Sequence, residues 1–155
     1  MCIKRRTLHT PVGKIELRAD ENGLCGLRFH AREDQNDDCE ILDWAQRELE
    51  EYFAGRRRIF SVPLSIVGTP FQQKVWRTLC GIPYGETRSY GEIAAQTGNK
   101  KAARAVGMAN NKNPLPVLIP CHRVIGAGGR LTGYAGGLEI KEILLGIEER
   151  NRDNV

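Results

Sequence analysis

The chain has 155 residues, of which 41% are hydrophobic and 27% are charged, a composition typical of a globular protein. No apolar run is long enough to span a bilayer, and no signal-peptide core follows the first residues, so we expect no membrane contact. The five cysteines show no paired spacing, which indicates free thiols and a cytoplasmic protein, or a nuclear one in a eukaryote.

The net charge of +4 is unevenly distributed along the chain. Residues 1–62 carry eleven Lys and Arg against twelve Asp and Glu, whereas residues 74–130 carry nine against two. A positive charge gathered in one region suits a polyanionic partner such as nucleic acid. A basic surface that is merely solvated is the alternative interpretation.

The first part of the chain alternates strand and helix patterns. Residues 3–30 alternate as strands do, with a turn at residues 20–23, and residues 31–39 read as an exposed loop. From Ile41 the apolar period becomes helical, and Gly55 ends that helix. We expect one further strand over residues 59–63, and we interpret the run Arg56-Arg57-Arg58 as solvated surface.

We therefore expect an N-terminal structural α/β domain over residues 1–62 and a linker over residues 63–68. Residues 69–155 are predicted to form a second, mostly helical domain. Its first helix has Thr69 as a plausible N-cap and Pro70 at the first helical position. The predicted fold class is α+β.

Two short helices follow in this second part. Ser89 and Glu92 fit the capping box that begins a helix, and residues 100–109 predict another helix after a tight turn. A pair of this kind is typical of a helix-turn-helix. Its second helix carries mostly small side chains, so Arg104 is the long group that could reach into DNA. Alternatively, the alanines pack on the core and Arg104 is an ordinary surface charge.

The apolar residues 117–119 predict a short buried strand that stops at Pro120, directly before Cys121 and His122. A thiol is a strong nucleophile once it becomes a thiolate, and positive surroundings lower its pKa. His122 could take the proton directly or through water, and Glu148, near the end of a helix predicted from residue 138, could orient His122. Two other interpretations stay open at this point, a buried cysteine that only packs and a Cys–His hydrolase that turns over.

We expect no cofactor and no metal. The glycine-rich residues 126–137 lack the dinucleotide-binding and phosphate-loop patterns. The three histidines and the cysteines lack the spacing of metal ligands. A loop whose backbone N–H groups approach a flat ligand fits these glycines better.

Several motifs in the second half occur together in one order. These are Thr69-Pro70-Phe71-Gln72, Ile82-Pro83-Tyr84-Gly85-Glu86-Thr87, Ser89-Tyr90-Gly91, Ala102-Ala103-Arg104-Ala105-Val106-Gly107, Asn113-Pro114, Pro120-Cys121-His122-Arg123-Val124 and Gly133-Tyr134-Ala135-Gly136-Gly137. With Lys141-Glu142 to Leu145 and Glu148, they resemble the O6-alkylguanine-DNA alkyltransferases over essentially all of residues 69–148. The first part is similar only in outline.

The resemblance implies repair of double-stranded DNA by a monomer that flips an O6-alkylguanine out of the duplex. The alkyl group, from this base and from O4-alkylthymine, would pass to Cys121 in a single, irreversible turnover. His122, a water and Glu148 would help to deprotonate the thiol. Arg104 would fill the space left by the flipped base.

The same resemblance implies a set of contacts with the base. Tyr90 would help to rotate the nucleotide and bond N3, and the carbonyls of Cys121 and Val124 would accept from the amino group. The backbone N–H of Ala135 would bond O6. Tyr134 would form the wall of the pocket, and Asn113 would brace the turn that carries Cys121.

The sequence also departs from the family pattern. Lys100 and Lys101 stand where relatives often have Pro or Gly, which suggests stronger phosphate contact and a steeper salt dependence. Ala135 stands where many relatives have Ser, so a hydroxyl contact is lost and a backbone contact is kept. The nearest alternative function is that of a non-enzymatic alkyltransferase-like protein, but such proteins lack the reactive cysteine that is present here as Cys121. A second alternative is a transcriptional regulator that uses the helix-turn-helix.

Overall fold

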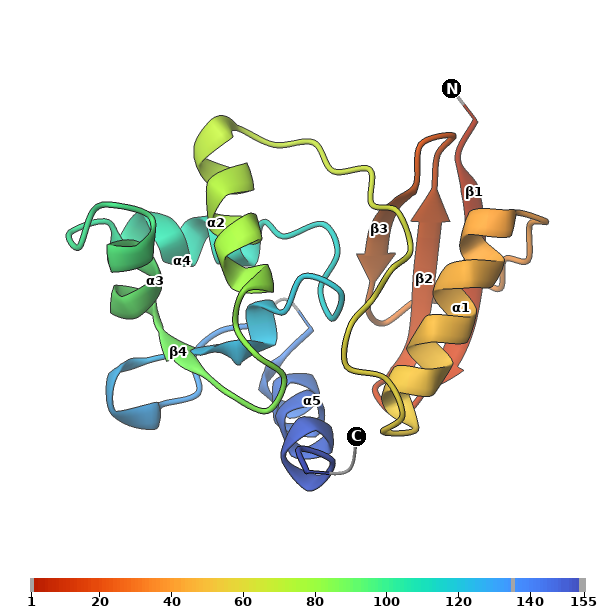
Figure 1. Ribbon diagram of the computed structural model, residues 1–155. Helices are drawn as coiled ribbons and strands as arrows, with labels where there is room; N and C mark the ends of the chain where they lie inside the picture. The colour runs from red at the N-terminus through yellow and green to blue at the C-terminus, as the bar shows by residue number, and fades with distance from the viewer. Residues whose placement is uncertain (1, 135, 154–155) are drawn as a thin grey trace.

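The computed structural model describes residues 2–134 and 136–153. A sheet with one helix on its face lies beside a group of helices, and an extended segment joins the two parts (Figure 1). This is the α+β arrangement expected from the sequence. Within the described ranges, no helix combines the length and the apolarity that a membrane span requires.

The sheet contains three antiparallel strands in the order β1-β2-β3: β1 (Lys4–Thr10), β2 (Gly13–Ala19) and β3 (Leu24–Arg28). Ile15, Leu17 and Ala19 alternate along β2 and are fully buried, as expected for a sheet with one covered face. The predicted turn before β3 is confirmed, and the carboxylate of Asp20 accepts hydrogen bonds from the backbone N–H groups of residues 22 and 23.

Helix α1 (Glu40–Phe53) covers the sheet and confirms the helical period. Its buried face is formed by Leu42, Ala45, Glu48, Leu49 and Tyr52. The chain leaves the helix through Gly55, whose φ of 77° favours glycine.

The strand predicted over residues 59–63 is wrong. The N–H groups of Ser61 and Val62 donate to the buried carboxylate of Glu48, at 2.9 Å each, instead of to a neighbouring strand. The interpretation of the arginine run as solvated surface holds only for the exposed Arg56. Arg57 pairs with Glu48 at 3.0 Å, and Arg58 donates to the backbone carbonyls of residues 151 and 152 at the end of the last helix.

The helical part begins with α2 (Pro70–Cys80), whose Thr69 cap is confirmed and completed by Gln72. The other elements are β4 (Arg88–Ser89), α3 (Tyr90–Gln96), α4 (Ala103–Asn111), η1 (Cys121–Arg123), β5 (Val124–Ile125), η2 (Ala127–Gly129) and α5 (Leu138–Arg150). The capping box of Ser89 is present at the start of α3, and α3 packs on α4 as the helix-turn-helix prediction requires. Helix α4 starts later than predicted because residues 99–102 form a turn, in which Asn99 accepts from the N–H of Lys101.

The strand predicted over residues 117–119 is also wrong. This stretch is a tight turn, closed by a 2.9 Å hydrogen bond from the N–H of Ile119 to the carbonyl of Leu115. Val117 at its centre has a φ of 77°, a conformation that a strand excludes. The apolar side chains of the turn are buried, which is why the sequence resembles a core strand.

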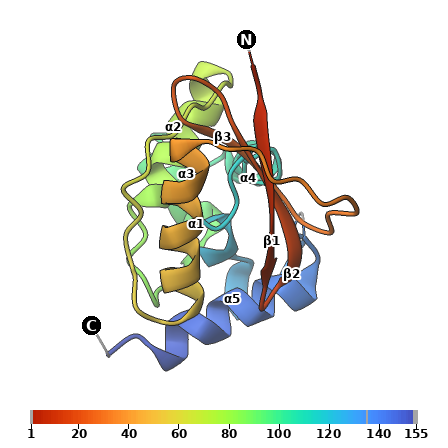
Figure 2. The same cartoon turned by 90° about the vertical axis from the view of Figure 1, so that its right-hand side faces the viewer.

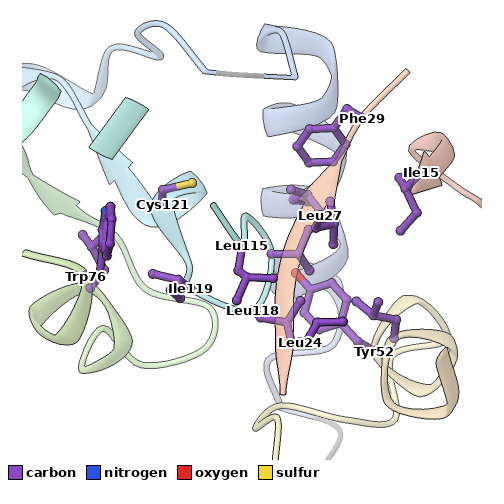
Figure 3. Packing of buried hydrophobic residues seen from close by; sticks show 14 of the residues in the cluster. Ile15, Leu24, Leu27, Phe29, Tyr52, Trp76, Leu115, Leu118, Ile119 and Cys121 are labelled. Carbon is purple, nitrogen blue, oxygen red and sulfur yellow. The ribbon is translucent and has the colours of Figure 1, made fainter. Parts of the chain in front are cut away.

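The buried residues of the two parts form one continuous cluster. Leu115 and Leu118 from the turn lie between Trp76 on one side and Leu24 and Leu27 of β3 on the other (Figure 3). Helix α5 runs along the bottom of the molecule, below α1 and the sheet (Figure 2). The turn that precedes Cys121 is therefore packed against the sheet as well as against the helices.

We predict that Glu48→Ala lowers the free energy of unfolding by about 2–4 kcal/mol, because the N–H groups of residues 61 and 62 lose a buried, charged acceptor. Urea denaturation at neutral pH measures the change. Glu50→Ala, an exposed site on the same helix, is the control and should change the stability by less than about 0.5 kcal/mol. Equal losses in the two variants would contradict the prediction.

Candidate active site

Cys121 begins η1, a 3-10 helix of three residues, and is 2% exposed. The tight turn before it is braced by Asn113, whose amide donates to the carbonyl of Ile119 at 2.8 Å and whose carbonyl oxygen accepts from the N–H of Leu115 at 2.9 Å. The N–H of Cys121 itself donates to the Ile119 carbonyl at 2.7 Å. The sulfur is therefore held on a fixed backbone, although that backbone is not the strand end expected from the sequence.

Burial raises the pKa of the Cys121 thiol to about 11. The Asn113 amide, the Tyr134 hydroxyl and the Lys141 ammonium act in the opposite direction, but burial outweighs them. The expectation that positive surroundings lower the pKa of this thiol is thus wrong in its net direction. At neutral pH the resting group is a thiol, and its conversion to a nucleophile needs a base.

That base is adjacent. His122 is fully buried, and its Nε2 lies 2.7 Å from Oε2 of Glu148. Burial lowers the pKa of His122, with partial compensation by Glu148, so the imidazole is neutral. Burial alone would raise the pKa of Glu148, but His122 and Arg123 hold it well below its usual range, so this carboxylate is ionised.

These protonation states fix the roles of the imidazole nitrogens. An ionised carboxylate only accepts, so Nε2 carries the proton and donates to Glu148. Nδ1 is then the basic nitrogen, and within the described part of the chain it has no hydrogen-bond partner. An unpartnered basic nitrogen on the residue next to a thiol can receive the thiol proton.

The structure adds three partners of Glu148 that the sequence did not identify. Arg123 donates through Nε to Oε1 at 2.8 Å and through Nη2 to Oε2 at 3.0 Å. The hydroxyl of Tyr52, in α1, donates to Oε2 at 2.6 Å, and the N–H of Gly85 lies 3.3 Å from Oε1. Arg123 belongs to the motif Pro120-Cys121-His122-Arg123-Val124, but Tyr52 falls on the apolar stripe of its helix, a position that indicates only a core residue.

A second missed residue is Lys141, which is fully buried in α5. Its ammonium donates to the carbonyl of Val124 at 2.7 Å and to that of Thr132 at 3.3 Å. The hydroxyls of Thr132 and Tyr90 are 2.8 Å apart, so Tyr90 is linked to the same group. Lys141 belongs to the Lys141-Glu142 to Leu145 motif of the sequence, but the sequence assigned it no role.

The structure brings together most of the predicted site residues. The Asn113 amide and the Tyr134 hydroxyl bond the thiol of Cys121, and His122, the next residue in the chain, bonds Glu148. Tyr134 is 9% exposed, and its ring lies 5.8 Å from that of Phe29. Ala135, predicted to bond O6, lies outside the described residues.

Arg104 stands apart from this group, exposed on α4. Val106 and Ala109 of the same helix are buried, whereas Ala105 is exposed beside Arg104, so only part of the small residues pack on the core. The neighbouring Met108 is 64% exposed and was not singled out from the sequence. Tyr90 lies against this helix, since a Cβ added to Gly107 would stand 3.8 Å from its ring.

No group of three or more His, Cys, Asp or Glu that could hold a metal is found among the described residues. A cavity of about 540 Å³ lies on the far side of the active-site turn, lined by Pro120 and Arg123 but not by Cys121. Its walls also include Phe60, Ile82 and Tyr84. This cavity does not open on the thiol, so it is not the pocket for the reacting base.

Comparison with known proteins accounts for both parts of this chain. Residues 70–150 match the DNA-binding domain of 6-O-methylguanine DNA methyltransferase, and residues 3–66 match the ribonuclease-like domain of the same protein. A methylated-DNA–protein-cysteine methyltransferase of Methanosarcina acetivorans is 51% identical over 90% of this chain and 94% of its own length. The constitutive enzyme of that name from Bacillus subtilis is 49% identical over 92% of this chain and 93% of its own length.

The structural comparison agrees. A crystal structure of Mycobacterium tuberculosis OGT in complex with DNA aligns with a TM-score of 0.88 and 47% identity, over 96% of this chain and 94% of the other. A buried cysteine beside a histidine–carboxylate pair, next to a helix-turn-helix, is the site of a DNA-binding protein with a reactive thiol. The chain belongs to the 6-O-methylguanine DNA methyltransferase family, as the sequence motifs indicated.

We predict that iodoacetamide labels Cys121 in the folded protein at least about tenfold more slowly than it labels the exposed Cys2, because the Cys121 thiol is buried and protonated. Peptide mass mapping over time measures both rates. The labelling of Cys121 should continue to accelerate up to about pH 11, where its thiol ionises. In urea the two cysteines should react at similar rates, and a fast, pH-independent reaction of native Cys121 would contradict the assignment.

Proposed function

We propose that this chain repairs double-stranded DNA by direct reversal, transferring the alkyl group of O6-alkylguanine to Cys121. The observation that carries the proposal is the neutral imidazole of His122, the residue after the buried Cys121. Its Nε2 donates to the ionised Glu148, and its basic Nδ1 is unpartnered within the described residues. The family, and the DNA named with the M. tuberculosis structure, support duplex DNA as the partner.

The reaction follows from these groups. The thiol proton passes through a water to Nδ1 of His122, and Glu148 stabilises the imidazolium that forms. The thiolate attacks the alkyl carbon in line with the C–O6 bond. A carbon–sulfur bond forms, the carbon–oxygen bond breaks, and its electron pair leaves with the guanine, which takes up a proton. The product is a thioether, and since no group here cleaves one, each molecule reacts once.

The proposed contacts with the base use the remaining residues. The carbonyls of Cys121 and Val124 accept from the guanine amino group, and the Tyr90 hydroxyl bonds N3. The carbonyl of Val124 already accepts from Lys141, which leaves one of its lone pairs for the base. Ala135 is proposed to bond O6 through its backbone N–H. Tyr134 forms the wall of the pocket, and Asn113 braces the turn that holds the sulfur.

Arg104 is proposed to act on the DNA and not on the alkyl group. It is exposed on α4, the second helix of the helix-turn-helix, among side chains small enough for a close approach to the duplex. An inserted guanidinium can occupy the space that a flipped base leaves.

Residues 1–62 and 69–155 are proposed to act as two domains joined by residues 63–68. The separate matches at residues 3–66 and 70–150 support this division. We further propose a cytoplasmic location. The unpaired cysteines of the described chain, which suit a reducing compartment, support it.

A duplex that carries O6-methylguanine should methylate Cys121 in a one-to-one ratio with the protein, because the thioether cannot be cleaved again. Peptide mass mapping detects the adduct, and Cys121→Ala should abolish it while DNA binding is retained. Multiple turnovers would point instead to a hydrolase, and binding without an adduct would point to an alkyltransferase-like protein.

Arg104→Ala should slow repair of the duplex at least about tenfold, since loss of a flipping contact leaves part of an unstacking cost of a few kcal/mol uncompensated. The reaction with free O6-benzylguanine, which needs no flipping, should change by less than about twofold. Single-turnover rates measure both. Arg77→Ala, which removes an equal exposed charge from α2, is the control for simple electrostatic attraction. Equal losses on both substrates would contradict the proposed role of Arg104.

A further inference from the structure

One oxygen atom of Glu148 receives three donors. Oε2 lies 2.6 Å from the Tyr52 hydroxyl, 2.7 Å from Nε2 of His122 and 3.0 Å from Nη2 of Arg123. Each donor draws on the same negative charge, so each weakens the pull of the carboxylate on the other two. The strength of the bond to His122 therefore depends on whether Tyr52 is present.

Tyr52 comes from the other part of the molecule. It is 96 residues from Glu148 in the sequence and projects from α1, which covers the N-terminal sheet. The hydrogen bond from its hydroxyl to Glu148 thus links α1 directly to the proposed proton relay.

The position of this hydroxyl is closely defined. Tyr52 is fully buried, and three aromatic rings surround its own, with centroid distances of 5.4 Å to Phe53, 5.5 Å to Phe60 and 6.2 Å to Tyr84. A Cβ added to Gly55, just after α1, would stand 2.5 Å from the side chain of Asn151, just after α5. The ends of the two helices therefore meet closely, and Arg58 joins them through the backbone carbonyls beyond α5.

We propose that Tyr52 is a positioning residue for alkyl transfer, whose hydroxyl orients Glu148 and moderates the basicity of His122. The inference rests on the proposed function and gives the N-terminal part a role in the reaction beyond structural support. The N-terminal part thereby completes the relay that activates Cys121.

Other ionisable groups also face this relay. Arg123 in η1 acts on Glu148 and Tyr52, and Tyr84, in the loop before β4, acts on Tyr52 and feels the charge of Glu148. Lys141 of α5 acts on His122 and on Cys121. These groups are unchanged when only the Tyr52 hydroxyl is removed, so a change in pH dependence reports that hydroxyl.

Tyr52→Phe keeps the ring and removes the donor. With one competitor gone, Glu148 binds His122 more strongly and favours its protonated form. A protonated His122 cannot accept the thiol proton, so the acidic limb of the rate profile should move up by about half a pH unit or more. At pH values on the acidic limb the variant should react at least about threefold more slowly than the unaltered protein, and near pH 9 the rates of the two proteins should converge.

The experiment measures single-turnover transfer from free O6-benzylguanine between about pH 5 and 9, which avoids any effect on DNA binding. Tyr84→Phe is the matched control. It removes a buried tyrosine hydroxyl from a ring next to Tyr52, and that hydroxyl has no hydrogen-bond partner in the described structure. An NMR titration of the His122 imidazole in the folded protein gives a second readout and should move in the same direction.

Three results would overturn the inference. These are an unchanged acidic limb in Tyr52→Phe, a slowing that is equal at every pH, as a structural defect gives, and an equal displacement in Tyr84→Phe. Each of them leaves the proposed function intact as long as the unaltered protein alkylates Cys121. Failure of the unaltered protein to form that adduct is the separate result that removes the proposed function.

Discussion

A single buried carboxylate organises this molecule. An ion as buried as Glu148 is costly unless its oxygens are well supplied with donors. The donors come from α1, from the loop before β4 and from η1, so the two parts of the chain converge on one charge. The same charge sets the tautomer of His122 and leaves its Nδ1 as the basic nitrogen. Packing of the two parts and preparation of the nucleophile thus depend on one group.

Local signals in the sequence were reliable where the local chain decides the structure. The caps at Thr69 and Ser89 and the period of α1 depend on neighbouring residues, and the structure confirms them. The failures at residues 59–63 and 117–119 share a cause: hydrogen bonds to distant groups or within a turn replaced those of a strand. An apolar run shows that a segment is buried but does not show which partner its backbone finds.

For the site, too, the sequence identified residues that belong to local motifs and missed those whose role depends on distant contacts. Cys121, His122 and Glu148 could be chosen from motif and chemistry, and the structure brings His122 and Glu148 into contact. Tyr52 and Lys141 could not be chosen, because a tyrosine on an apolar helix face and a lysine in an amphipathic helix carry no sign of their partners. The charge of the surroundings was visible in the sequence, but the depth of burial was not, and burial decides the ionisation of the thiol.

The turn η1 gives three consecutive residues three different sets of partners. A 3-10 helix has about three residues per turn, so neighbouring side chains diverge by roughly 120°. The thiol of Cys121 bonds Asn113 and Tyr134, whereas His122 and Arg123 both reach Glu148, and Arg123 also donates to the carbonyl of Ile82. Inserting or deleting one residue here would rotate every later side chain into its neighbour's place. Length variation in related chains should therefore be excluded from this turn and tolerated in the exposed glycine-rich residues 127–130.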